Sequence, residues 1–153
     1  TVFDGLMGRS MSSRLFPSVR ERRGLSYDIR SSLQFFEDAG AWTVTAGLDT
    51  KRVPVALAAI RREIDRIRTT KVGAAELRRT KDYLIGNFRL AFEKPSSRLF
   101  YYGPCVLAYG HIVSPEEQIA RTEAVTAADI LAVAKAILDD RNLSISWVTP
   151  KHE

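Results

Sequence analysis

Two residues of the segment 11–27 could do chemistry together. Arg20 carries a guanidinium group and Tyr27 carries a phenol seven residues further along the chain, and both groups donate hydrogen bonds. The pattern places Arg20 at the end of a helix and Tyr27 at the start of a strand, on either side of one tight turn. Such an arrangement can aim both side chains at one external point.

The elements that must position this pair are indicated by the residues around it. Ser12 or Ser13 can cap a helix, because a serine oxygen accepts a hydrogen bond from an otherwise unpaired N–H of the first turn. Three arginines then suit the negative end of the helix dipole, and Gly24 is best able to take the left-handed conformation that ends a helix. We therefore expect a helix over 13–23, a turn at Gly24 and a strand after it. Residue types alone also allow a plainer interpretation, in which the arginines are solvated and the tyrosine packs.

Two segments with period-two alternation predict an antiparallel hairpin after this turn. The first covers 27–36 and the second covers 41–48, and residues 37–40 form a polar turn between them. Alternation of this kind is typical of strands with one buried face. The residues expected on the buried faces are Tyr27, Ile29, Ser31, Leu33 and Phe35 in the first strand and Trp42, Val44, Ala46 and Leu48 in the second.

The second half of the chain is expected to be helical up to a last strand. Apolar spacing predicts helices from Pro54 to about 67, over 74–92, over 99–109 as a buried helix, from Ser114, and from Thr126 to about 137. Residues 143–148 alternate again and predict a final strand. Together these elements predict an α+β fold, in which an antiparallel-dominated sheet carries helices on one face.

Composition limits the function classes. The 153 residues fit one domain, which we assign to 1–149 with a polar tail at 150–153, and no apolar run is long enough for a membrane span. Cys105 is the only cysteine, so no internal disulfide forms, and we expect it to be a small buried residue. Basic residues gather in 14–30 and in 51–81, and the net charge of +5 allows a nucleic-acid module. Acidic residues interrupt the second of these clusters, so we expect no nucleic-acid binding.

A long gapped motif reads Gly8-x-x-x-Ser12-Ser13-Arg14-Leu15-Phe16, then Val19-Arg20-Glu21-x-Arg23-Gly24-Leu25-x-Tyr27. This motif resembles the second, non-metal half-domain of the pitrilysin/insulinase-type zinc metallopeptidases, which include the mitochondrial processing peptidases. The likeness continues through Asp38-x-Gly40 and, more weakly, to about residue 148. It implies a half-domain sandwich whose first strand would lie outside this chain, and a chain that starts with Thr1 is consistent with a fragment.

The resemblance implies a role for the pair. Active members place an arginine and a tyrosine at this spacing opposite the zinc, which here implies that Arg20 and Tyr27 are catalytic and stabilise the oxyanion of peptide hydrolysis. The zinc and the general base would come from a companion domain with an H-x-x-E-H motif. This chain has no such motif, and His111 and His152 are expected to be surface or packing residues, so the chain alone should neither bind zinc nor hydrolyse peptides.

The implied partners are the companion domain, in the same polypeptide or a separate subunit, and an unfolded peptide substrate. The main alternative is a non-catalytic structural or substrate-holding subunit. An apolar face left open by the absent first strand could also let the chain form a homodimer. We expect a soluble protein of the bacterial cytoplasm or periplasm rather than of the mitochondrial matrix.

Overall fold

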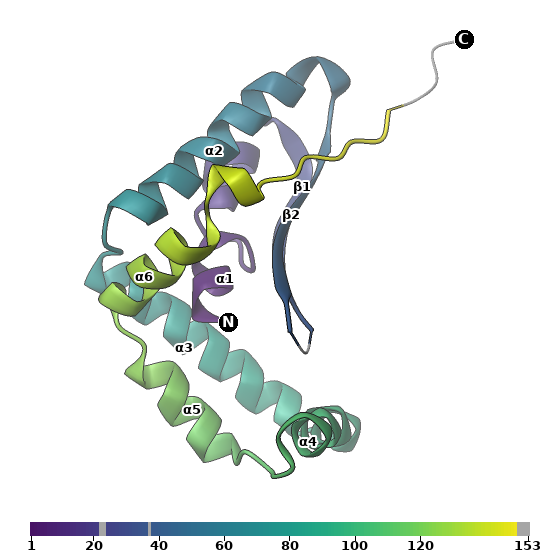
Figure 1. The fold of residues 1–153 in the computed structure, drawn as a ribbon, viewed down its shortest axis with the longest axis vertical. Coiled ribbons are helices and arrows are strands. Elements are labelled where there is room, and N and C mark those ends of the chain that lie inside the picture. Colours follow the sequence, from purple (N-terminus) through teal and green to yellow (C-terminus); the bar gives the residue numbers. More distant parts are fainter. Residues whose placement is uncertain (22–23, 37, 150–153) are drawn as a thin grey trace.

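The computed structural model describes residues 1–21, 24–36 and 38–149. The described residues are mostly helical, with one two-stranded antiparallel sheet. The helices lie along one side of the hairpin (Figure 1). The predicted α+β class, with helices on one face of an antiparallel sheet, is confirmed.

The elements follow one another with short connections. The hairpin consists of β1 (Ser26–Phe35) and β2 (Gly40–Leu48), and a short buried helix and a π-helix precede it. In chain order the helices are α1 (Val2–Met7), the π-helix η1 (Phe16–Glu21), the 3-10 turn η2 (Thr50–Arg52), α2 (Val53–Thr69), α3 (Ala74–Phe92), α4 (Pro95–Tyr109), α5 (Pro115–Ala124), α6 (Ala127–Ile137) and the 3-10 turn η3 (Asp140–Asn142).

The hairpin forms as its alternation predicts over most of its length. The register pairs Ile29 with Ala46 and Leu33 with Trp42. The inward side chains of β2 pack against the buried core, and the ring of Trp42 meets that of Phe3 edge to face at 5.3 Å between centroids. Phe35, expected on the buried face, is instead exposed because it lies at the hairpin tip, where no core residue reaches it.

Helix α1 forms the centre of the core, between α3 and β1. All six of its residues are buried, and its Asp4 accepts hydrogen bonds from the Ser31 hydroxyl and from Trp42 Nε1, the latter at 3.1 Å. Gly8 follows the helix, and a Cβ placed on it would lie 2.7 Å from the backbone nitrogen of Ser31. Only a glycine therefore permits this close approach to β1.

The predicted starts of the last two helices are confirmed. The Ser114 hydroxyl accepts from the Glu117 N–H at the start of α5. Thr126 and Asp129 form a capping box at the start of α6, in which each side chain bonds the backbone of the other. Among the described residues, none of the helices has the length and the apolar run that crossing a bilayer requires.

Four predictions about the helices and the last strand are wrong. The helix expected over 13–23 is a shorter π-helix, and its Arg22 and Arg23 lie outside the described residues. The Ser13 hydroxyl donates to the Ser10 carbonyl, so it closes a turn instead of capping the helix. Residues 143–149 form no strand, because no described strand pairs with their backbone, and a strand depends on hydrogen bonds to a neighbour.

The fourth concerns α4, which begins before the predicted residue 99 and is not buried. It begins at Pro95 and continues through Pro104. Its Phe100 is 77% exposed and its Leu107 is 89% exposed. The reason is that α4 packs mainly on α3, so the rest of its apolar surface has no neighbour among the described elements.

Candidate functional site

The turn between η1 and β1 brings the two candidate residues onto adjacent segments. The Gly24 N–H donates to the Arg20 carbonyl at 2.9 Å, and the Leu25 N–H donates to the Val19 carbonyl at 3.0 Å. Val19 and Leu25 are buried, so they anchor both sides of the turn in the core. Gly24 has φ of +55°, which confirms the predicted left-handed conformation.

Side chains of α2 and α3 hold η1 in place. The Ser18 hydroxyl donates to Glu63 Oε1 at 2.6 Å, and Glu63 is buried on α2. Arg14, just before η1, forms a two-pronged ion pair with Glu76 in the first turn of α3, with distances of 2.7 and 2.9 Å. This hydrogen-bonded pair lowers the pKa of Glu76 and raises that of Arg14. The segment that carries Arg20 is therefore fixed by polar contacts to two long helices.

Arg20 lies in the π-helix itself and is exposed. Its guanidinium carbon lies 4.7 Å from the centre of the Phe16 ring, a distance typical of a cation–π contact. A π-helix closes its backbone hydrogen bonds over one residue more than an α-helix (i→i+5), and such turns occur frequently at functional sites. The contact with Phe16 restricts the guanidinium without removing it from solvent.

Tyr27 lies in a β-bulge. Ser26 pairs with Leu48, and the next pair is Asp28 with Gly47. Between these two pairs the chain moves two residues along β1 but only one along β2, so Tyr27 has no partner in the ladder. The side chain of Tyr27 is 91% exposed. The sequence alternation predicted it on the buried face with Ile29, and that prediction is wrong, because one extra residue reverses the side to which a strand residue points.

The two candidates thus share an unusual backbone setting. Arg20 lies in a π-helix and Tyr27 in a β-bulge, and both side chains are exposed although the residues directly before them, Val19 and Ser26, are buried. Burial in the core accounts for the presence of motif residues such as Val19 and Leu25. Arg20 and Tyr27 are exposed, so packing does not account for these two residues. Chemically, the arrangement offers a cation and a neutral hydroxyl donor to a ligand outside this chain.

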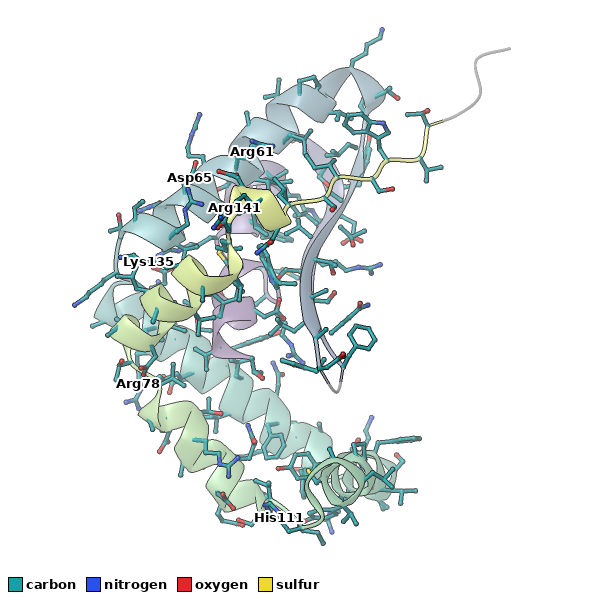
Figure 2. All side chains as sticks on the ribbon, viewed as in Figure 1. Arg61, Asp65, Arg78, His111, Lys135 and Arg141 are labelled. Atoms are coloured by element: carbon teal, nitrogen blue, oxygen red, sulfur yellow. The ribbon has the colours of Figure 1, made fainter. Side chains whose placement is uncertain are left out.

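The remaining candidates lie elsewhere. His111 is in the connection between α4 and α5, at the end of the molecule that these helices form (Figure 2). His152 lies outside the described residues. Cys105 is half-buried on α4. In the part of the chain that the structure describes, no cluster of three or more His, Cys, Asp or Glu side chains could hold a metal ion, so these residues do not fit a zinc site.

Sequence reasoning missed several residues that shape the site. Glu63 contacts Ser18 across 45 positions and Glu76 contacts Arg14 across 62 positions, and the contact of Phe16 with Arg20 was not predicted. Ser26, whose hydroxyl donates to backbone carbonyls within the bulge, gave no signal, since a serine at a strand start is unremarkable. None of these partners could be chosen from sequence spacing alone.

Comparison with known proteins identifies the family. A family model described as the peptidase M16 inactive domain matches residues 1–84. An uncharacterized zinc protease of Streptomyces coelicolor is 34% identical over 149 residues, which cover 97% of this chain and 32% of that protein. One of Mycobacterium tuberculosis is 33% identical over 141 residues, with 92% and 32% covered. The chain therefore spans about a third of the length of these curated relatives.

Solved structures agree. A conserved protein of Enterococcus faecalis V583 superposes with a TM-score of 0.75 and 34% identity, over 88% of this chain and 31% of that one. The peptidase M16 inactive domain of Pseudomonas fluorescens has a TM-score of 0.75 at 17% identity, over 88% and 32%, which shows a common fold. Since the family model matches more than half of the 153 residues, the chain belongs to the M16 peptidase family and corresponds to the domain that its description calls inactive.

Proposed function

We propose that this chain is the C-terminal half-domain, over 1–149, of a zinc-dependent metalloendopeptidase that acts on unfolded peptides. The relatives called zinc proteases are about three times as long as this chain, which leaves room for a companion half-domain. That companion, with an H-x-x-E-H motif, supplies the zinc and the general base. This half supplies Arg20 and Tyr27 to the composite site.

One observation carries the proposal: both residues of the pair are exposed at backbone irregularities that packing does not require. The phenol of Tyr27 is 91% exposed at the bulge, and Arg20 is exposed on the π-helix. Irregular turns and bulges are enriched next to active sites, where they re-aim a side chain. Large exposed side chains on so well-anchored a turn are suited to a ligand that arrives from outside.

The reaction gives each residue a distinct task. When water adds to the scissile carbonyl carbon, the carbonyl oxygen acquires negative charge, and the Tyr27 hydroxyl donates a hydrogen bond to it. The Arg20 guanidinium binds a substrate carbonyl on the C-terminal side or shares the same oxygen. The C–N bond then breaks and the leaving nitrogen takes a proton. When bound in the companion, zinc supplies a Lewis acid for the carbonyl and lowers the pKa of water.

The test is peptidase activity on an unfolded peptide with zinc present. This chain alone should be inactive, and the full-length protein should be active. Tyr27→Phe in the full-length protein should lower kcat about 10²–10³-fold, because it removes one donor to the developing oxyanion. Tyr83→Phe is the matched control, since Tyr83 is an exposed tyrosine on α3, away from the turn, and it should leave kcat unchanged.

Two results would contradict the proposal. An active full-length protein that is indifferent to Tyr27→Phe would make this half a structural or substrate-holding partner. Activity from this chain alone would show that the zinc and the base do not come from a companion.

A further inference from the structure

The bulge at Tyr27 changes which side of β1 each residue occupies. Ser26 and Ile29 are both buried, and the two residues between them, Tyr27 and Asp28, are both exposed. In a regular strand Tyr27 would point to the same side as Ile29, toward the helices. The interaction that keeps the extra residue out of the regular pairing therefore decides whether the phenol faces the outside or the core.

Ser26 is the side chain placed to do this. It is buried, and its hydroxyl lies 2.5 Å from the Asp28 carbonyl oxygen and 2.9 Å from the Gly47 carbonyl oxygen. These carbonyls belong to the two residues that pair with each other directly after the skipped position. One hydroxyl proton shared between them joins both strands at the point where the ladder loses its regular bonds.

No other described contact accounts for the bulge. The residue opposite is Gly47, and a Cβ on it would meet no atom within 4 Å, so crowding on β2 does not force the irregularity. Tyr27 itself is too exposed to be held by packing. The hydroxyl of Ser26 is the specific interaction that remains.

We propose that Ser26 is a positioning residue, which acts through the bulge to hold the Tyr27 hydroxyl toward the substrate. The inference rests on the proposed function, because it presumes that Tyr27 donates to the reacting oxygen. Without the shared hydrogen bond the extra residue can slip into the ladder, and the phenol turns away from its target.

A double-mutant cycle on the full-length protein tests this, with kcat and KM measured for Ser26→Ala, Tyr27→Phe and the double variant. Ser26→Ala should lower kcat between about tenfold and 10²-fold, since a displacement of about 1 Å at a reacting group has an effect of that order. The same substitution should have no further effect in the Tyr27→Phe background, because the hydroxyl that it positions is gone. KM should change little.

Ser31→Ala is the matched control. Ser31 is a buried serine of the same strand, whose hydroxyl bonds Asp4 and not the bulge, so kcat should be retained even where stability falls. Ser26→Thr keeps the hydroxyl and should recover most of the activity that Ser26→Ala loses.

The outcomes separate the two proposals. Suppose that Tyr27→Phe lowers kcat but Ser26→Ala does not, or that Ser26→Ala lowers kcat equally in the wild-type and the Tyr27→Phe protein. In either case Ser26 has no positioning role, while the proposed function stands. A folded Ser26→Thr variant as slow as Ser26→Ala would also overturn it. If Tyr27→Phe has no effect, the proposed function fails and the role of Ser26 fails with it.

Discussion

Two regions of this molecule present tyrosines in opposite ways. The turn unit, residues 14–21 and 24–29, exposes Tyr27 on a backbone that is held in place by buried neighbours and by the ion pair of Arg14 with Glu76. The aromatic arm, where α3 meets α4, surrounds Tyr101 with rings of Phe88, Phe92 and Tyr102 at centroid distances of 5.2–5.4 Å. Its hydroxyl is buried and has no hydrogen-bond partner among the described residues. The same residue type is available for chemistry in one region and serves packing in the other.

The electrostatics follow this difference. Burial raises the pKa of Tyr101, with smaller contributions from Cys105 and Tyr102. In the turn unit, Arg14 is paired with Glu76, whereas the guanidinium of Arg20 is exposed. We infer that function depends on a rigid polar support under an exposed side chain, which the aromatic arm lacks. Four predictions test this comparison, from the largest expected effect to the smallest.

Gly8, which packs closely against β1, should not tolerate a larger side chain. Gly8→Ala places a Cβ 2.7 Å from the Ser31 backbone nitrogen, which must displace β1, and we expect a loss of about 3 kcal/mol in the free energy of unfolding. In the arm, Gly86 has no atom within 4 Å of the same position, so Gly86→Ala should stabilise α3 by about 1 kcal/mol. Urea unfolding of the two variants measures both. Equal effects would remove the distinction between the regions.

Arg20→Ala should impair activity without destabilising the fold. The guanidinium is exposed, so unfolding by urea should be nearly unchanged, while kcat/KM of the full-length protein should fall about 10²-fold through loss of a charged donor. Arg30→Ala is the control, because Arg30 is an exposed arginine of β1 that lies 3.8 Å from the carboxylate of Asp28. A comparable loss for Arg30→Ala would indicate a general charge effect.

The ion pair below the turn should give a pH-dependent stability. Because Arg14 lowers the pKa of Glu76 from its ordinary 4.5, the pair contributes stability above that value and loses it as pH falls through the lower, folded pKa. Glu76→Gln should therefore cost about 2 kcal/mol at pH 7, and the difference from wild type should shrink below pH 4.5. Urea titrations at pH 7 and at about pH 3 measure this.

Asp82→Asn is the control for this prediction. Asp82 pairs with Arg78 on the exposed side of the same helix, and such surface pairs contribute only about 0.5 kcal/mol. A Glu76→Gln variant that loses the same stability at both pH values would show that the charge of Glu76 is not what stabilises the unit.

The smallest effect is expected in the aromatic arm. Tyr101→Phe removes a buried hydroxyl that has no described partner, so the free energy of unfolding should stay level or rise by up to about 1 kcal/mol. Activity should be unchanged, which is the reverse of the result expected for Tyr27→Phe. If Tyr101→Phe lowers kcat while Tyr27→Phe does not, the assignment of roles to the two regions is wrong.

Local chemistry made much of the fold predictable. Alternation along 27–36 and 41–48 identified the hairpin, and the serine and threonine caps located the starts of α5 and α6. Prediction failed where a residue's environment comes from distant segments. The apolar sequence of α4 suggested burial, yet no described element covers its outer face, and the alternation of 143–148 lacked a strand to pair with.

The sequence by itself determined the family, the α+β class, the left-handed turn at Gly24 and the spacing that singled out Arg20 and Tyr27, because each depends on residues close together in the chain. Only the tertiary structure decided that Arg20 lies on a π-helix held by Glu63 and Glu76, and that Tyr27 is skipped in the ladder and faces outward. The physical reason is that an extra residue in a helix or strand persists only where partners from other elements fix it, and those partners are set by the fold.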